Sequence, residues 1–157
     1  MEAIAELKKD KTVASWIPTR KDETFTSDDL IDAYLHGRKD AFAAAKRLAF
    51  DKLNTNIEKS KDITVSLLNT LKRHNFNPVD AYLMVDGFDY FKILITVPEL
   101  ERANEDFLEM YDLVAELEEK NKNEFYYVLV SFCHINEYFD EEKVLSDGYI
   151  LKLSNNV

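Results

Sequence analysis

Cys133 and His134 are adjacent, and Cys133 is the only cysteine of the 157-residue chain. A thiol and an imidazole act as nucleophile and base when the two side chains can hydrogen-bond to each other. Both residues lie in the run Phe125 to Ile135, whose β-branched and aromatic residues are typical of a strand. Successive side chains of a strand point to opposite faces of the sheet. We therefore expect Cys133 to pack in the core, and we assign no catalytic residue.

Carboxylates at predicted turns are a second group whose residue types suit a chemical step. Asp86 and Asp89 flank a tight turn, and Asp140 lies in the acidic run that follows Ile135. Clustered carboxylates can hold Mg²⁺ for phosphoryl or nucleotidyl transfer. The chain has only three glycines and no Gly-rich phosphate-binding motif. We assign no metal ligand and no cofactor, and a metal-dependent transferase using Asp86, Asp89 and Asp140 stays open as the alternative function.

A stripe of acidic residues is the least ordinary feature of the sequence. Its members recur at spacings of three and four, which places them on one side of a helix: Glu101, Glu105, Glu109, Asp112, Glu116 and Glu119. Like charges four residues apart each destabilise a helix by about 0.2–0.5 kcal/mol. Only Arg102 offers a cation within this helix before its last turn. The stripe predicts a contact surface for a basic partner.

The helix that carries this stripe is predicted over Thr96 to Asn123. Thr96 and Glu99 match a capping box, and Pro98 suits a first turn. The opposite side shows a helical spacing of apolar residues, namely Leu100, Ala103, Phe107, Met110, Val114 and Leu117. Lys120 to Asn123 suit the negative end of the helix.

Strands are predicted on both sides of this helix. The runs 79–85 and 88–97 form a hairpin, in which Asp86-Gly87 indicates a type I′ turn that pairs Leu83 with Tyr90. The run Phe125 to Ile135 is apolar on both faces, so we expect a central strand covered on both sides. A short helix or turn at 137–145 and a last strand at 149–153 complete the order β-β-α-β-(α)-β.

The first half of the chain is predicted to be helical. Residues 1–26 form an N-terminal arm that is flexible or packs through Trp16. A first helix opens at Thr26, and further helices span about 39–59 and 62–74. The fold class is therefore α+β: about three helices in residues 27–78 pack on a small, mostly antiparallel sheet in residues 79–157. Residues 27–157 make one domain, with the first helices covering the other face of the sheet.

The charge distribution argues against several classes of partner, and a nucleic-acid binder that uses the helices of the first half stays open as a third function. The chain has a net charge of −10, which resides wholly in residues 79–157, with 6 basic and 18 acidic residues. Such a surface repels nucleic acid and anionic membranes. The basic residues of the first half alternate with acids, which argues against a nucleic-acid groove. No apolar run approaches the ~20 residues of a membrane span, and no secretory signal is visible, so we expect a cytoplasmic location.

The sequence thus favours a small acidic protein that binds another protein without catalysing a reaction. A regulator, an adaptor and an immunity-type inhibitor all fit this description, and the acidic stripe is the expected contact surface. The ten phenylalanines and eight tyrosines also make a homodimer an expectation. No resemblance to a known family supports any of these interpretations.

Overall fold

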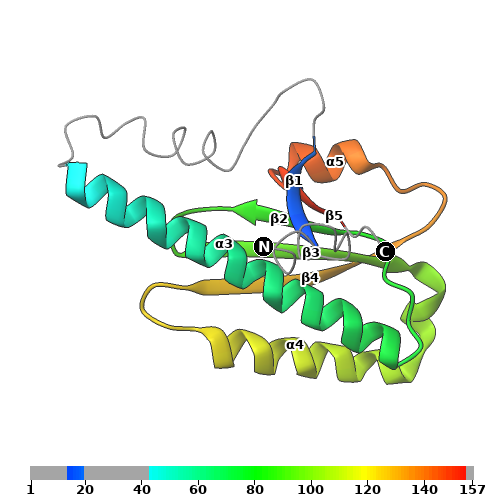
Figure 1. The fold of residues 1–157 in the computed structure, drawn as a ribbon. Helices are drawn as coiled ribbons and strands as arrows, with labels where there is room; N and C mark the ends of the chain where they lie inside the picture. Colours follow the sequence, from blue (N-terminus) through cyan, green and yellow to red (C-terminus); the bar gives the residue numbers. More distant parts are fainter. Residues whose placement is uncertain (1–13, 20–42, 155–157) are drawn as a thin grey trace, which may run out of the picture.

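A five-stranded sheet with two long helices on one of its faces forms the body of the protein (Figure 1). The computed structural model describes residues 14–19 and 43–154. The strand order is β1-β5-β2-β3-β4, and only the β3–β4 pair is parallel. The predicted α+β class with a mostly antiparallel sheet is confirmed. The strands are Ser15–Pro18 (β1), Ala81–Val85 (β2), Tyr90–Pro98 (β3), Tyr127–Ile135 (β4) and Leu151–Ser154 (β5), and the α-helices are Ala43–Arg73 (α3), Leu108–Asn121 (α4) and Glu141–Ser146 (α5).

Helix α3 is one continuous helix of 31 residues, so the predicted break near residue 60 is wrong. Polar residues at positions 60 and 64 interrupt its apolar stripe, yet Ser60 and Thr64 are fully buried. The hydroxyl of Ser60 donates to the backbone carbonyl of Asn56, and the hydroxyl of Thr64 donates to the backbone carbonyl of Ser60. These bonds satisfy the hydroxyls inside the helix, so the helix can bury them in phase with Leu53 and Leu67. The helix predicted to begin at Thr26 lies outside the described residues.

The first strand lies within the segment that we predicted as an N-terminal arm. β1 pairs with β5 and places Trp16 opposite Leu153 on the face that meets α3. The indole N–H of Trp16 donates to the carbonyl of Ile57 at 3.3 Å, and the ring packs against the core. Among the described elements, this strand therefore precedes every helix, whereas the sequence predicts a helical section followed by the sheet.

The hairpin of β2 and β3 has a different register from the predicted one. Leu83 lies opposite Ile93 rather than Tyr90, and the N–H of Asp86 bonds to the carbonyl of Tyr90. The loop is thus one residue longer than a type I′ turn. Gly87 does not have the positive φ that such a turn requires. Gly87 is instead buried, which favours a longer loop that packs inward.

The helix predicted from Thr96 begins only at Leu108, because β3 continues through Pro98. Thr96 is buried in the strand, where its side chain accepts a hydrogen bond from the N–H of Asp80. Its parallel pairing with Cys133 and the extended backbone of Pro98 override the capping signal. Two short 3₁₀ segments, Glu99–Ala103 (η2) and Glu105–Phe107 (η3), then lead into α4.

β4 lies at the edge of the described sheet, so the prediction of a central strand is wrong. Its inward residues, such as Val128 and Val130, are buried beneath α3 and α4, while Leu129 and Cys133 on the opposite face are only partly buried. The apolar residues on both sides therefore reflect one buried face and one partly covered face rather than a strand buried on both sides.

Both long helices cover the same face, which we call the inner face and which carries Phe91, Ile93 and Ile95. Residues of α3 and α4 join one core cluster with these strands, and α4 runs beside β4 (Figure 1). Helix α3, which spans the helices predicted at 39–59 and 62–74, therefore lies on the same face as α4, and the prediction that it covers the other face is wrong. On the outer face, α5 packs over β2, where Tyr82 bonds to Glu141.

Candidate functional site

The acidic residues that follow β3 form an exposed ridge along the solvent side of α4. Five of the six predicted binding residues are exposed, and we call them the acidic ridge: Glu105, Glu109, Asp112, Glu116 and Glu119. Glu105 lies in η3 and the other four lie on α4. The buried side of α4 carries Met110 and Val114, so the hydrophobic packing of this helix holds the ridge in the solvent.

Glu101 does not belong to the ridge. Its carboxylate accepts hydrogen bonds from the backbone N–H of Asn77 at 2.8 Å and from the side-chain amide of Asn77 at 2.9 Å. It therefore ties η2 to the segment between α3 and β2. Glu101 was predicted to lie on the stripe because the prediction assumed one continuous helix from Thr96. The 3₁₀ segments change the direction of this side chain.

No ion pair neutralises the ridge within the described residues. The three salt bridges there are Lys61–Glu58, Lys152–Asp80 and Lys152–Glu141, and all lie elsewhere. Lys59 of α3 reaches α4, but its ammonium donates to the carbonyl of Asn121 at 3.1 Å. The basic residues of the first half thus do not pair with the ridge inside this part of the chain.

An apolar strip borders the ridge on the side nearest β4. Leu108 is 65% exposed and Tyr111 is 45% exposed, and they lie one turn apart on α4. The ring of Tyr111 makes an edge contact with Phe132 of β4, with centroids 5.4 Å apart. Neither Leu108 nor Tyr111 belongs to the apolar stripe predicted from the sequence. A better helix boundary would have revealed their exposure.

The carboxylates of the alternative function are not brought together. Asp86 and Asp89 lie at the β2–β3 turn, while the side chain of Asp140 accepts from the N–H of Glu142 and caps α5. β4 carries the chain along β3, away from that turn, before Asp140 is reached. In residues 14–19 and 43–154, no group of three or more metal-ligating side chains is close enough to hold a metal ion.

Cys133 and His134 point to opposite faces of β4, as predicted. The ring of His134 contacts Phe107 on the inner side, with centroids 5.1 Å apart. Cys133 lies across from Thr96 on the outer side, and partial burial raises the pKa of its thiol. A raised pKa disfavours the thiolate, so the environment does not activate this cysteine.

A cluster of charged groups on the outer face was not found from the sequence. The hydroxyl of Tyr82 donates to Glu141 at 2.7 Å, and the ammonium of Lys152 lies 2.9 Å from the same carboxylate and 3.6 Å from Asp80. Burial and the hydrogen bond to Glu141 raise the pKa of Tyr82. The hydrogen bonds that Glu141 accepts from Tyr82 and Lys152 lower the pKa of Glu141. The cluster fastens α5 to the sheet. The residue pairs that make these three contacts are 11, 59 and 72 positions apart, so no sequence motif marks the cluster.

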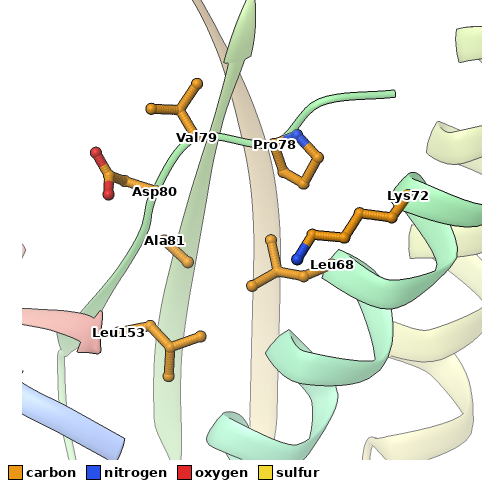
Figure 2. Close-up of a pocket in the computed structure, with 7 residues that line it drawn as sticks. All are labelled: Leu68, Lys72, Pro78, Val79, Asp80, Ala81 and Leu153. Atoms are coloured by element: carbon orange, nitrogen blue, oxygen red, sulfur yellow. The ribbon is translucent and has the colours of Figure 1, made fainter. Parts of the chain in front are cut away.

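A cavity of about 150 Å³ lies between the end of α3 and the start of β2. Figure 2 shows the residues that line it. Apolar side chains of Leu68, Ala81 and Leu153 line it, and the stem of Lys72 lies along one side (Figure 2). The carboxylate of Asp80 points away from Lys72. The cavity holds no convergent set of polar groups, so it does not resemble a catalytic pocket.

The structure thus defines an α+β protein whose most distinctive surface is the acidic ridge with its apolar border. Comparison with known proteins gives no match: no family model, no curated protein and no solved structure is significantly similar to the chain. Among the described helices, none is both long enough and apolar enough to cross a membrane.

Proposed function

We propose that this chain is a non-enzymatic protein that binds a basic partner protein through the acidic ridge, as a regulator, adaptor or immunity-type inhibitor. One observation carries the proposal: the five ridge carboxylates are exposed and have no cationic partner among the described residues. A basic surface would remove the repulsion between them and would be attracted over a Debye length of roughly 8 Å at physiological salt.

The rigidity of α4 supports this proposal. Its inner residues belong to the core, and Lys59 and Glu118 tie its last turns to α3 and β4. A preorganised charged surface loses little conformational entropy on binding, so more of the interaction energy appears as affinity. No specific observation favours the alternative transferase, because Asp86, Asp89 and Asp140 lie apart.

The test is affinity purification from the native host with the ridge reversed. The variant Glu105→Lys, Glu109→Lys and Asp112→Lys should lose the partners that the unmodified chain retains. A matched control reverses three exposed acids elsewhere, namely Asp51→Lys, Asp62→Lys and Glu137→Lys, and so changes the net charge equally. Retention of every partner by the ridge variant, or equal loss in both variants, would contradict the proposal. Light scattering on the purified chain tests the expected homodimer.

A further inference from the structure

The free edge of β4 lies beside the acidic ridge and its apolar strip. The N–H of Val130 points away from β3, because it donates to the carboxylate of Glu118. Alternate residues of a strand in a parallel pair direct their backbone groups to the same side. The N–H and C=O groups of Phe132 and His134 therefore also point outward. Among the described residues, no hydrogen bond is found to these two outward N–H groups.

An unpaired strand edge is a template for another strand. Proteins usually protect such edges, and here Glu118 protects Val130 only. From Ser131 to Ile135, β4 pairs with β3 on one side, and on its outward side no strand lies within residues 14–19 and 43–154. It therefore offers outward donors and acceptors to an extended segment.

The side chains around this edge indicate what kind of segment would fit. Leu108, Tyr111 and Phe132 present apolar surface next to it, and Asp112 and Glu109 of the ridge follow on the solvent side of α4. A strand alternates its side chains between two sides. Helix α4 lies on the inner side of the sheet, so only the inward side chains of an added strand would face the apolar strip and the ridge. A segment whose successive inward positions carry an apolar residue and then lysine or arginine would place the first kind on the apolar strip and the second kind near the ridge.

We propose that the edge of β4 from Ser131 to Ile135 receives an extended basic segment of the partner protein as a sixth strand. The inference rests on the proposed function, and it names the mode of binding at the same surface. Main-chain hydrogen bonds to Phe132 and His134 supply affinity, whereas the apolar strip and the ridge supply specificity.

The test uses the full chain and two synthetic peptides of equal charge. One peptide is strand-forming, with valine and lysine at successive inward positions and threonine between them, and the control peptide places the same number of lysines in an alanine-rich helix. The strand-forming peptide should slow amide hydrogen exchange at Phe132 and His134 by at least ~10-fold at saturation. Exchange at Val130 should change little, because its N–H is already bonded to Glu118.

Leu108→Ala should weaken binding of the strand-forming peptide by about 3- to 10-fold, since it removes apolar contact area. Leu48→Ala on α3 is the matched control, because Leu48 is 72% exposed and lies on another element. This substitution should leave the affinity unchanged.

The outcomes separate this inference from the proposed function. Binding that depends on the ridge but leaves Phe132 and His134 unprotected would overturn the added strand and leave the proposed function standing. Protection of the two amides that survives reversal of the ridge would support the edge and contradict the acidic contact surface. Equal binding of both peptides without amide protection would overturn the inference.

Discussion

The backbone N–H of Val130 in β4 donates a hydrogen bond of 2.8 Å to the carboxylate of Glu118 in α4. Glu118 belongs to the same acidic helix as the ridge, yet it turns toward the sheet and is partly buried. It occupies part of the strand edge that would otherwise be open. One helix therefore has two kinds of carboxylate: Glu118 supports the fold, and the ridge faces solvent.

We predict that Glu118→Ala destabilises the protein by about 1 kcal/mol, because it leaves the N–H of the buried Val130 without an acceptor. Glu118→Gln retains a side-chain oxygen and should cost less than half as much. Urea denaturation measures both values, and hydrogen exchange at Val130 should accelerate in the alanine variant alone. Equal stability of the two variants would show that this bond contributes nothing.

A second prediction concerns the hydrogen bond of 2.8 Å between the hydroxyls of Ser60 and Tyr126. Both side chains are almost fully buried, and Ser60 also bonds to the carbonyl of Asn56. Ser60→Ala should cost about 1–3 kcal/mol, since it leaves the hydroxyl of Tyr126 unpaired. Tyr126→Phe leaves Ser60 with its helical partner and should cost less. The double variant should be more stable than the sum of the two single effects indicates, which a double-mutant cycle in urea measures.

The same tyrosine makes stability depend on alkaline pH. Burial raises the pKa of Tyr126 to about 12, although the bond to Ser60 partly opposes this shift. Between pH ~10 and ~12 the unfolded chain loses the phenolic proton while the folded chain keeps it. The free energy of unfolding should therefore fall as pH rises in this window, by up to ~1.4 kcal/mol per pH unit from this group.

Tyr126→Phe should make that slope less steep without removing it, because burial and Glu141 also raise the pKa of Tyr82. Urea denaturation at several pH values measures the slope, and tyrosinate absorbance identifies the groups that titrate. An unchanged slope in the variant would show that Tyr126 ionises similarly in the folded and unfolded chains.

The sequence predicted those elements whose signals are local and uninterrupted. The strand from Tyr127 and the last strand follow dense β-branched and aromatic runs, and α5 follows an acidic start after Asp140. The predicted alternation of Cys133 and His134 is confirmed for the same reason. Each of these features needs only a few consecutive residues to agree.

The errors arose where distant partners decide the local structure. Thr96 has a capping motif, but its bonds to Asp80 keep it in a strand. Ser60 looks like a break in an apolar stripe, but its bond to Tyr126 lets the helix continue. The candidate site followed the same pattern. The ridge on α4 was predicted from periodicity, whereas Glu101 turns away from the ridge because it bonds to Asn77, 24 residues away.

The acidic ridge leads to the last prediction, which compares stability with binding. Asp112 lies three residues after Glu109 and four before Glu116, and all three are exposed. Asp112→Lys replaces two repulsive pairs by attractive ones, each contributing about 0.2–0.5 kcal/mol, and lysine also has the higher helix propensity. We therefore expect the variant to be more stable than the unmodified protein by about 0.5–1 kcal/mol in urea at low salt.

Asp112→Asn removes the charge without adding a cation, so it should give a smaller gain. The gain of Asp112→Lys should shrink as salt is added, because screening weakens exposed pairs. If the ridge is a binding surface, the more stable variant should also bind its partner less tightly, so stability and affinity would change in opposite directions. A variant that gains stability and keeps full affinity would show that the repulsion at Asp112 is unrelated to binding.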